Sequence, residues 1–104
     1  MDGRELLRQM KPRLVEAYGS RLQNLVLYGS EARGEARPDS DIDVLVILRG
    51  PIQLWDDLHA AVRALYPLSL LWDRPITPLP VDADEYSEID CPLYRSARKE
   101  GITL

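Results

Sequence analysis

Two aspartates separated by one residue, Asp41 and Asp43, stand at the start of the apolar stretch 44–48. Side chains alternate between the two faces of a strand, so both carboxylates are expected on one face, about 6–7 Å apart. Two negative charges held this close repel each other unless a cation lies between them. Mg²⁺ prefers one or two carboxylates, with water and substrate phosphates as its other ligands. The pair is therefore a candidate magnesium site.

A Gly29-Ser30 pair follows another short apolar stretch, and the polar segment 31–40 separates it from Asp41. A glycine lets the backbone come close to a phosphate, to which nearby amides and the Ser30 hydroxyl can donate. A helical turn is expected in this loop, with Ser30 as its cap. Together the two features provide what phosphoryl and nucleotidyl transfer requires, because one can bind the phosphates and the other can bind the metal ion. Taken alone, each is more often a structural feature, an acidic strand start or an ordinary turn.

The elements that must position these residues follow from the apolar periodicity, which predicts the order α-β-β-α-β-α. Helices are expected at residues 2–18, 52–66 and 92–100, and strands at residues 22–28, 41–48 and 76–81. Pro67 is expected to end the middle helix early. Pro75, Pro78 and Pro80 place the third strand at an edge of the sheet. The predicted fold class is α/β (α+β), a small mixed sheet of three to four strands flanked by helices.

Composition limits the classes of protein to which the chain can belong. Its 104 residues suffice for one domain, and no repeat or low-complexity stretch divides them. The net charge of −4 argues against general nucleic-acid binding, which usually requires a basic face. The single cysteine, Cys91, excludes an internal disulfide and fits a reducing compartment. No apolar run approaches the roughly 20 residues that a membrane span needs, so a cytoplasmic protein is expected.

The joint pattern of Gly29-Ser30, the polar loop and Asp41-Ile42-Asp43 resembles the signature of the DNA-polymerase-β-type nucleotidyltransferase superfamily. The longer string GSEARGEARPDSDIDVLV is similar to its smallest branch, the minimal nucleotidyltransferase (MNT) domains. Weaker similarity extends to WDRPITPLPV and to CPLYRSARKEGI. The resemblance implies one MNT domain over residues 1–104, with a polymerase-β-like core.

This resemblance also implies roles for residues of the loop. Gly29 and Ser30 would contact the phosphates of the nucleotide, which is ATP in the predicted reaction. Arg33 and Gly34 would belong to the same nucleotide-binding loop.

The metal site that the resemblance implies would hold one or two Mg²⁺ ions on Asp41 and Asp43. The family usually adds a third carboxylate on a neighbouring strand, as a metal ligand or as the base that accepts a proton. Asp73 is the candidate, because it precedes the edge strand expected beside Asp43. Two interpretations of Asp73 remain open, third carboxylate or end of the preceding helix, since Pro75 occupies an equally suitable position.

The function implied by the resemblance is transfer of AMP from ATP to a hydroxyl group. The chain shows no second domain to bind an acceptor, so the acceptor is expected on another protein. MNT domains of this type are antitoxins whose partner is a helical HEPN ribonuclease toxin, and they can transfer AMP to a toxin tyrosine. Two alternatives remain open: a catalytically silent antitoxin that neutralises a HEPN partner by association, and a small-molecule nucleotidyltransferase. Assembly as a homo- or hetero-oligomer is left open as well.

Overall fold

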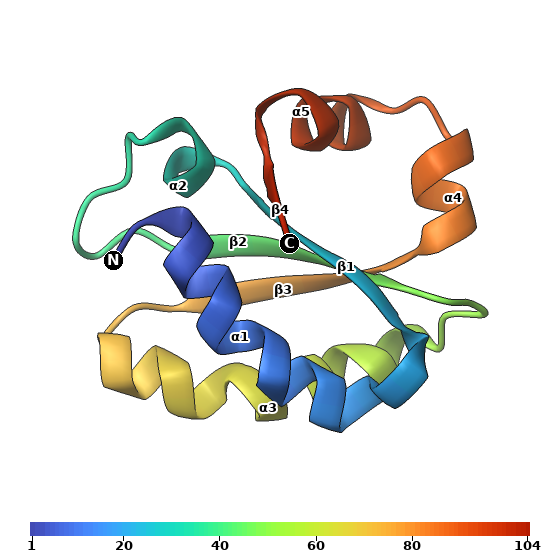
Figure 1. Cartoon of the computed structure of the whole chain (residues 1–104), viewed down its shortest axis with the longest axis horizontal. Helices are drawn as coiled ribbons and strands as arrows, with labels where there is room; N and C mark the ends of the chain where they lie inside the picture. The colour runs from blue at the N-terminus through green and yellow to red at the C-terminus, as the bar shows by residue number, and fades with distance from the viewer.

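The computed structural model describes all residues, 1–104, as a four-stranded sheet with helices packed on both faces (Figure 1). The strands are β1 (Leu22–Tyr28), β2 (Ile42–Leu48), β3 (Ile76–Asp82) and β4 (Ile102–Thr103). The helices are α1 (Gly3–Tyr18), α2 (Ser30–Arg33), α3 (Leu54–Trp72), α4 (Ala83–Glu88) and α5 (Pro92–Glu100), with a 3-10 turn η1 at Gly19–Arg21. The predicted α+β class with a mixed sheet is confirmed.

The sheet has the strand order β3-β2-β1-β4. Strand β1 runs antiparallel to β2 and β4, whereas β2 and β3 run parallel. Residues 44–48 of β2 are all buried, because β2 has a strand on each side and helices over each face. None of the helices combines the length and the hydropathy that crossing a membrane requires.

Strand β3 forms one edge of the sheet, as its prolines predict. The amide of Ile42 donates to the carbonyl of Pro75 at 2.9 Å, which fixes the parallel ladder between β2 and β3. Alternate residues of a strand direct their backbone groups to the same side, so Pro78 and Pro80 occupy positions whose amides would point away from the sheet. The free edge therefore lacks two of its donors.

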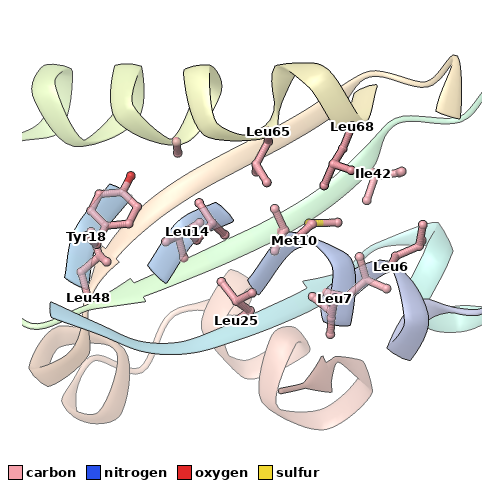
Figure 2. Close-up of a cluster of buried hydrophobic side chains, with 14 residues drawn as sticks. Leu6, Leu7, Met10, Leu14, Tyr18, Leu25, Ile42, Leu48, Leu65 and Leu68 are labelled. Atoms are coloured by element: carbon pink, nitrogen blue, oxygen red, sulfur yellow. The ribbon is translucent and has the colours of Figure 1, made fainter. Parts of the chain in front are cut away.

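Two hydrophobic cores lie on the two faces of the sheet. The larger contains 14 buried residues between the sheet and helices α1 and α3, and Figure 2 shows the side chains of both helices meeting those of β1 and β2. Helix α1 contributes Leu6, Met10, Leu14 and Tyr18, four residues apart, as its periodicity predicts. The smaller core lies under α4 and α5 and contains Val26, Leu45, Ile47, Val81 and Ala97.

Helix α3 does not end at Pro67, contrary to the sequence prediction, but continues to Trp72. Pro67 lies on the exposed side of the helix, while Leu65 and Leu68 beside it are buried. Burying two leucine side chains contributes about 1.5–3 kcal/mol each, which offsets the roughly 3 kcal/mol cost of an internal proline.

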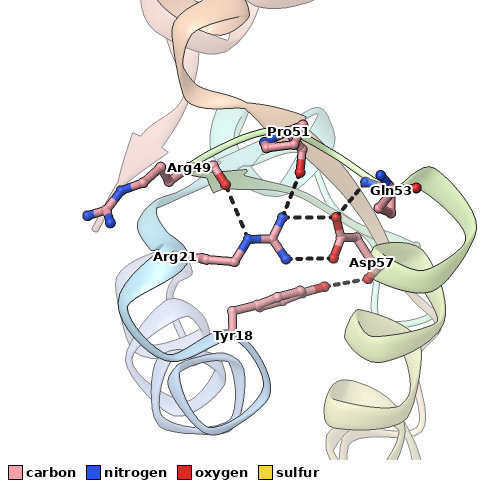
Figure 3. Close-up of polar contacts among 6 residues, drawn as sticks. All are labelled: Tyr18, Arg21, Arg49, Pro51, Gln53 and Asp57. Carbon is pink, nitrogen blue, oxygen red and sulfur yellow. Dashed lines mark hydrogen bonds and ion pairs between the residues drawn. The ribbon is translucent and has the colours of Figure 1, made fainter.

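A polar cluster joins the end of α1 to the start of α3 (Figure 3). The Arg21 guanidinium donates to both carboxylate oxygens of Asp57, at 2.9 and 3.0 Å, and to the carbonyls of Arg49 and Pro51, both at 3.2 Å. The Tyr18 hydroxyl donates to the Asp57 carbonyl. The hydrogen bond from Arg21 holds the pKa of the Asp57 carboxyl below its ordinary value. These contacts fix α3 relative to α1 on one face of the sheet.

Candidate active site

Asp43 lies near the start of β2, on the face of the sheet that carries the smaller core, and Asp41 lies just before the strand. Asp43 has the same strand parity as Leu45 and Ile47 of that core, while Ile42 between the two aspartates is buried in the larger core. Asp41 is exposed and Asp43 is partly buried. Asp41 lies one residue before β2, so the placement of its carboxylate on the face of Asp43 stays a prediction.

The two carboxylates have no cationic partner within the chain. Neither forms an ion pair, and the six ion pairs of the structure involve other acids. Burial raises the pKa of the Asp43 carboxyl, and the negative charge of Asp41 raises it further. A partly buried carboxylate beside a second negative charge is stabilised by a bound cation. The donor set, two carboxylates without competing partners, therefore fits Mg²⁺.

The Gly29 turn lies directly against Asp43. Tyr28, the last residue of β1, pairs with Asp43 across the sheet. Gly29 follows with φ of 74° and ψ of −151°, a conformation that is essentially restricted to glycine. A Cβ atom at this position would lie 2.8 Å from Oδ2 of Asp43. The sequence-predicted phosphate turn and the sequence-predicted metal carboxylate are therefore adjacent.

Ser30 is the first residue of α2, and Gly29 is the residue that precedes the helix. No side chain caps α2, so the expected capping role of Ser30 is wrong. The reason is that a cap needs extended backbone before the helix, and Gly29 in its positive-φ conformation occupies that position. Contact of Ser30 with a phosphate stays a prediction.

Arg33 and Gly34 form the other end of α2. The Arg33 guanidinium pairs with Glu35 at 3.1 Å and with Glu100 at 3.9 Å. Gly34 ends the helix with φ of 72° and lines a groove of about 540 Å³ beside the loop and the start of α1. Their role in binding a nucleotide stays a prediction.

Asp73 lies at the C-terminus of α3, where its φ of 52° makes it the one non-glycine residue with a left-handed backbone. Helix α3 packs on the face of the sheet opposite to Asp43. No three His, Cys, Asp or Glu side chains lie close enough together to hold a metal ion, so the structure does not group Asp73 with Asp41 and Asp43. The structure shows the helix-ending position, and the role of Asp73 as third carboxylate stays a prediction.

Sequence reasoning missed Arg74. Its guanidinium pairs with the Glu31 carboxylate in α2, and its Nε donates to the Ser40 carbonyl at 2.9 Å. Both side chains of the ion pair are mostly buried, and Nη2 of Arg74 is buried without a partner. Arg74 thereby ties the start of β3 to α2 and to the residue before Asp41. No sequence signal links Arg74 to Glu31, because their contact depends on the tertiary fold.

Three solved structures resemble this fold. A proposed nucleotidyltransferase from Sulfolobus solfataricus matches with a TM-score of 0.65 and 18% identity, over 95% of this chain and 76% of that chain. A toxin–antitoxin structure with AMP-PNP matches with a TM-score of 0.63 and 18% identity, over 91% and 69%. A proposed minimal nucleotidyltransferase matches with a TM-score of 0.58 and 28% identity, over 100% and 97%. At 18% identity the likeness establishes the fold alone.

A sequence profile provides the family. No protein of curated function matches the chain. The profile of the family described as Nucleotidyltransferase domain matches residues 7–104, which include the Gly29 turn, Asp41, Asp43 and the last strand. Because this match covers nearly the whole chain, the chain belongs to the nucleotidyltransferase domain family.

Proposed function

We propose that this nucleotidyltransferase depends on Mg²⁺ and transfers AMP from ATP to a hydroxyl of a partner protein, and that it acts as an antitoxin. The observation that carries the proposal is the pair Asp41 and Asp43, two carboxylates without cationic partners, of which Asp43 lies beside the Gly29 turn. The likeness to a toxin–antitoxin structure with AMP-PNP supports an adenosine nucleotide and a protein partner.

In the proposed reaction, the acceptor oxygen forms a bond to the α-phosphorus of ATP. The bond between that phosphorus and the oxygen that bridges to the β-phosphate breaks, and pyrophosphate leaves with the electron pair. The acceptor proton passes to water. Asp41 and Asp43 would hold Mg²⁺, which when bound neutralises charge on the triphosphate. The backbone at Gly29 and Ser30 would bind a phosphate, because a glycine lets the backbone come close to one.

The acceptor we propose is a tyrosine of a HEPN-type helical toxin. Support comes from the similarity of GSEARGEARPDSDIDVLV to MNT domains, which act on such partners, and from the exposed position of Asp41. We also place the protein in the cytoplasm, where a lone thiol such as Cys91 stays reduced.

Transfer can be tested with ATP labelled at the α-phosphate, Mg²⁺ and the purified HEPN protein. Label is expected on the HEPN protein, and substitution of the modified tyrosine by phenylalanine should abolish it. Asp41→Asn and Asp43→Asn should each lower transfer by at least about 100-fold, since both remove a metal ligand while keeping the side-chain volume. Asp39→Asn, in the exposed loop before β2, is the matched control and should transfer normally.

Two results would contradict the proposal. One is transfer by the Asp41→Asn/Asp43→Asn double variant at the rate of the native protein. The other is an unlabelled partner under conditions where the antitoxin is folded and neutralises the toxin.

The alternative of a catalytically silent antitoxin is favoured by one observation, the absence of a third carboxylate beside the first two. In this alternative, Asp41 and Asp43 are not needed to neutralise the toxin. If Asp41→Asn/Asp43→Asn neutralises the toxin as well as the native protein, and no label is transferred, association alone accounts for the function.

A further inference from the structure

The β2–β3 register identifies the side chain that β3 presents to the carboxylates. Asp43 pairs with Thr77 in the parallel ladder, and neighbouring strands lie about 4.8 Å apart. Thr77 shares its strand parity with Leu79 and Val81, which pack in the smaller core, on the face that carries Asp43. Thr77 is exposed. A row of three neighbouring side chains, Tyr28, Asp43 and Thr77, therefore crosses the sheet at the site.

No acidic residue of β3 can take the place of Thr77. Asp82 lies at the far end of the strand, where its carboxylate caps α4 by accepting from the amides of Asp84 and Glu85. Asp73 lies before the strand, at the end of α3 on the other face. Between Asp73 and the strand, Arg74 is held by Glu31 and the Ser40 carbonyl.

We propose that Thr77 is the β3 residue of the metal site, and that this site consequently offers two carboxylates and one neutral hydroxyl. The inference rests on the proposed function for the use of the cation. Affinity for a hard divalent cation rises with the number of charged oxygen ligands, so the protein alone binds the ion weakly. The triphosphate of the nucleotide supplies the missing negative charge. The cation and the nucleotide therefore bind together, each raising the affinity of the other.

A change of one residue tests this assignment without any transfer reaction. Mn²⁺, which takes the same carboxylate and water ligands as Mg²⁺, is titrated into the nucleotide-free protein and free Mn²⁺ is followed by electron paramagnetic resonance. Thr77→Asp should raise the Mn²⁺ affinity by about tenfold or more, because it adds a third carboxylate at the register position of Asp43. Thr77→Asn, similar in size to the aspartate variant but uncharged, should leave the affinity within about threefold of the native value.

Further measurements distinguish direct binding of Mn²⁺ by the new carboxylate from a general effect of its charge. In an Asp43→Asn background, the gain from Thr77→Asp should shrink severalfold, whereas a charge acting only through solvent would give the same gain. Adding a non-hydrolysable ATP analogue should tighten Mn²⁺ binding more in the native protein than in Thr77→Asp.

Three outcomes would overturn the inference. They are no gain from Thr77→Asp in a protein whose circular dichroism is native, an equal gain from Thr77→Asn, or a loss of affinity in Asp73→Asn, which would assign the third ligand to Asp73. Failure of the proposed function is a different result: Mn²⁺ binding follows the expected series, but no label from ATP reaches a partner.

Discussion

Gly29 affects both the backbone conformation and the chemistry of the site. Its φ and ψ suit glycine alone, and its missing side chain leaves room for the Asp43 carboxylate. Gly34 has a similar φ of 72°, but a Cβ there would meet nothing within 4 Å. Comparing substitutions at the two glycines therefore separates the effect of backbone strain from an effect on the Asp43 carboxylate.

Substituting Gly29 by alanine should lower the free energy of unfolding by about 1–3 kcal/mol, through the strained backbone. It should also weaken Mn²⁺ binding by about tenfold or more, because Oδ2 of Asp43 must move away from the new methyl group. Urea denaturation and Mn²⁺ titration measure the two effects. Gly34→Ala is the matched control, with a stability loss of about 1 kcal/mol and native Mn²⁺ binding. Equal weakening of Mn²⁺ binding by both substitutions would contradict the role given to Gly29.

Among the elements, α2 is joined to the segment before β3 by the mostly buried pair of Arg74 and Glu31. Replacing Arg74 by methionine leaves a mostly buried Glu31 carboxylate without its partner, which should lower the free energy of unfolding by about 3 kcal/mol. The double variant Arg74→Met/Glu31→Met should be less destabilised than Arg74→Met alone, because no buried charge is left unpaired. Urea denaturation of both variants gives the comparison. A double variant that is the less stable of the two would contradict this account.

The Arg21–Asp57 pair between α1 and α3 makes stability depend on pH. Because the pKa of Asp57 is lower in the folded than in the unfolded chain, the pair contributes its full stability above the ordinary value of 3.8 and loses it as the pH falls through the folded value. Asp57→Asn should therefore cost about 1–3 kcal/mol at pH 7, after allowing for the partly exposed Arg21. The difference from the native protein should shrink below pH 3.8. A difference that stays constant from pH 7 to pH 3 would contradict it.

Most elements could be predicted because their signals are local. The apolar residues of α1 follow the helical spacing of the sequence, and Ile42 and Asp43 lie on opposite faces of β2, as strand alternation predicts. What could not be predicted depends on partners distant in sequence. The register that sets Thr77, rather than Asp73, beside Asp43 is decided by strand pairing, and no periodicity encodes it.

Two other differences between the prediction and the structure also result from contacts between residues distant in sequence. Pro67 was expected to end α3, but the burial of Leu65 and Leu68 on the larger core keeps the helix intact. Strand β4 is only two residues long and has no pattern of its own, and it forms because Leu104 and Leu25 exchange backbone hydrogen bonds at 2.9 and 3.1 Å.

At the scale of the whole molecule, the two faces of the sheet are covered by hydrophobic cores of unequal size. The larger core has 14 buried residues, whereas the smaller, on the site's face, has five. Amides of α5 are therefore expected to open locally and exchange with deuterium faster than those of α1, by at least about tenfold, in mass-spectrometric measurements at neutral pH. Exchange of α5 at the rate of α1 would show that the molecule opens only as a unit.

The prolines of β3 have a consequence for how a partner can reach the site. A peptide that added itself to this edge as another strand would need amide donors at the positions of Pro78 and Pro80, and proline has none. The same gap blocks the edge-to-edge stacking of copies through which exposed strands form fibres. Macromolecules therefore have to approach Asp41, Asp43 and Thr77 over the face of the sheet, and recognition depends on side chains rather than on a shared backbone ladder.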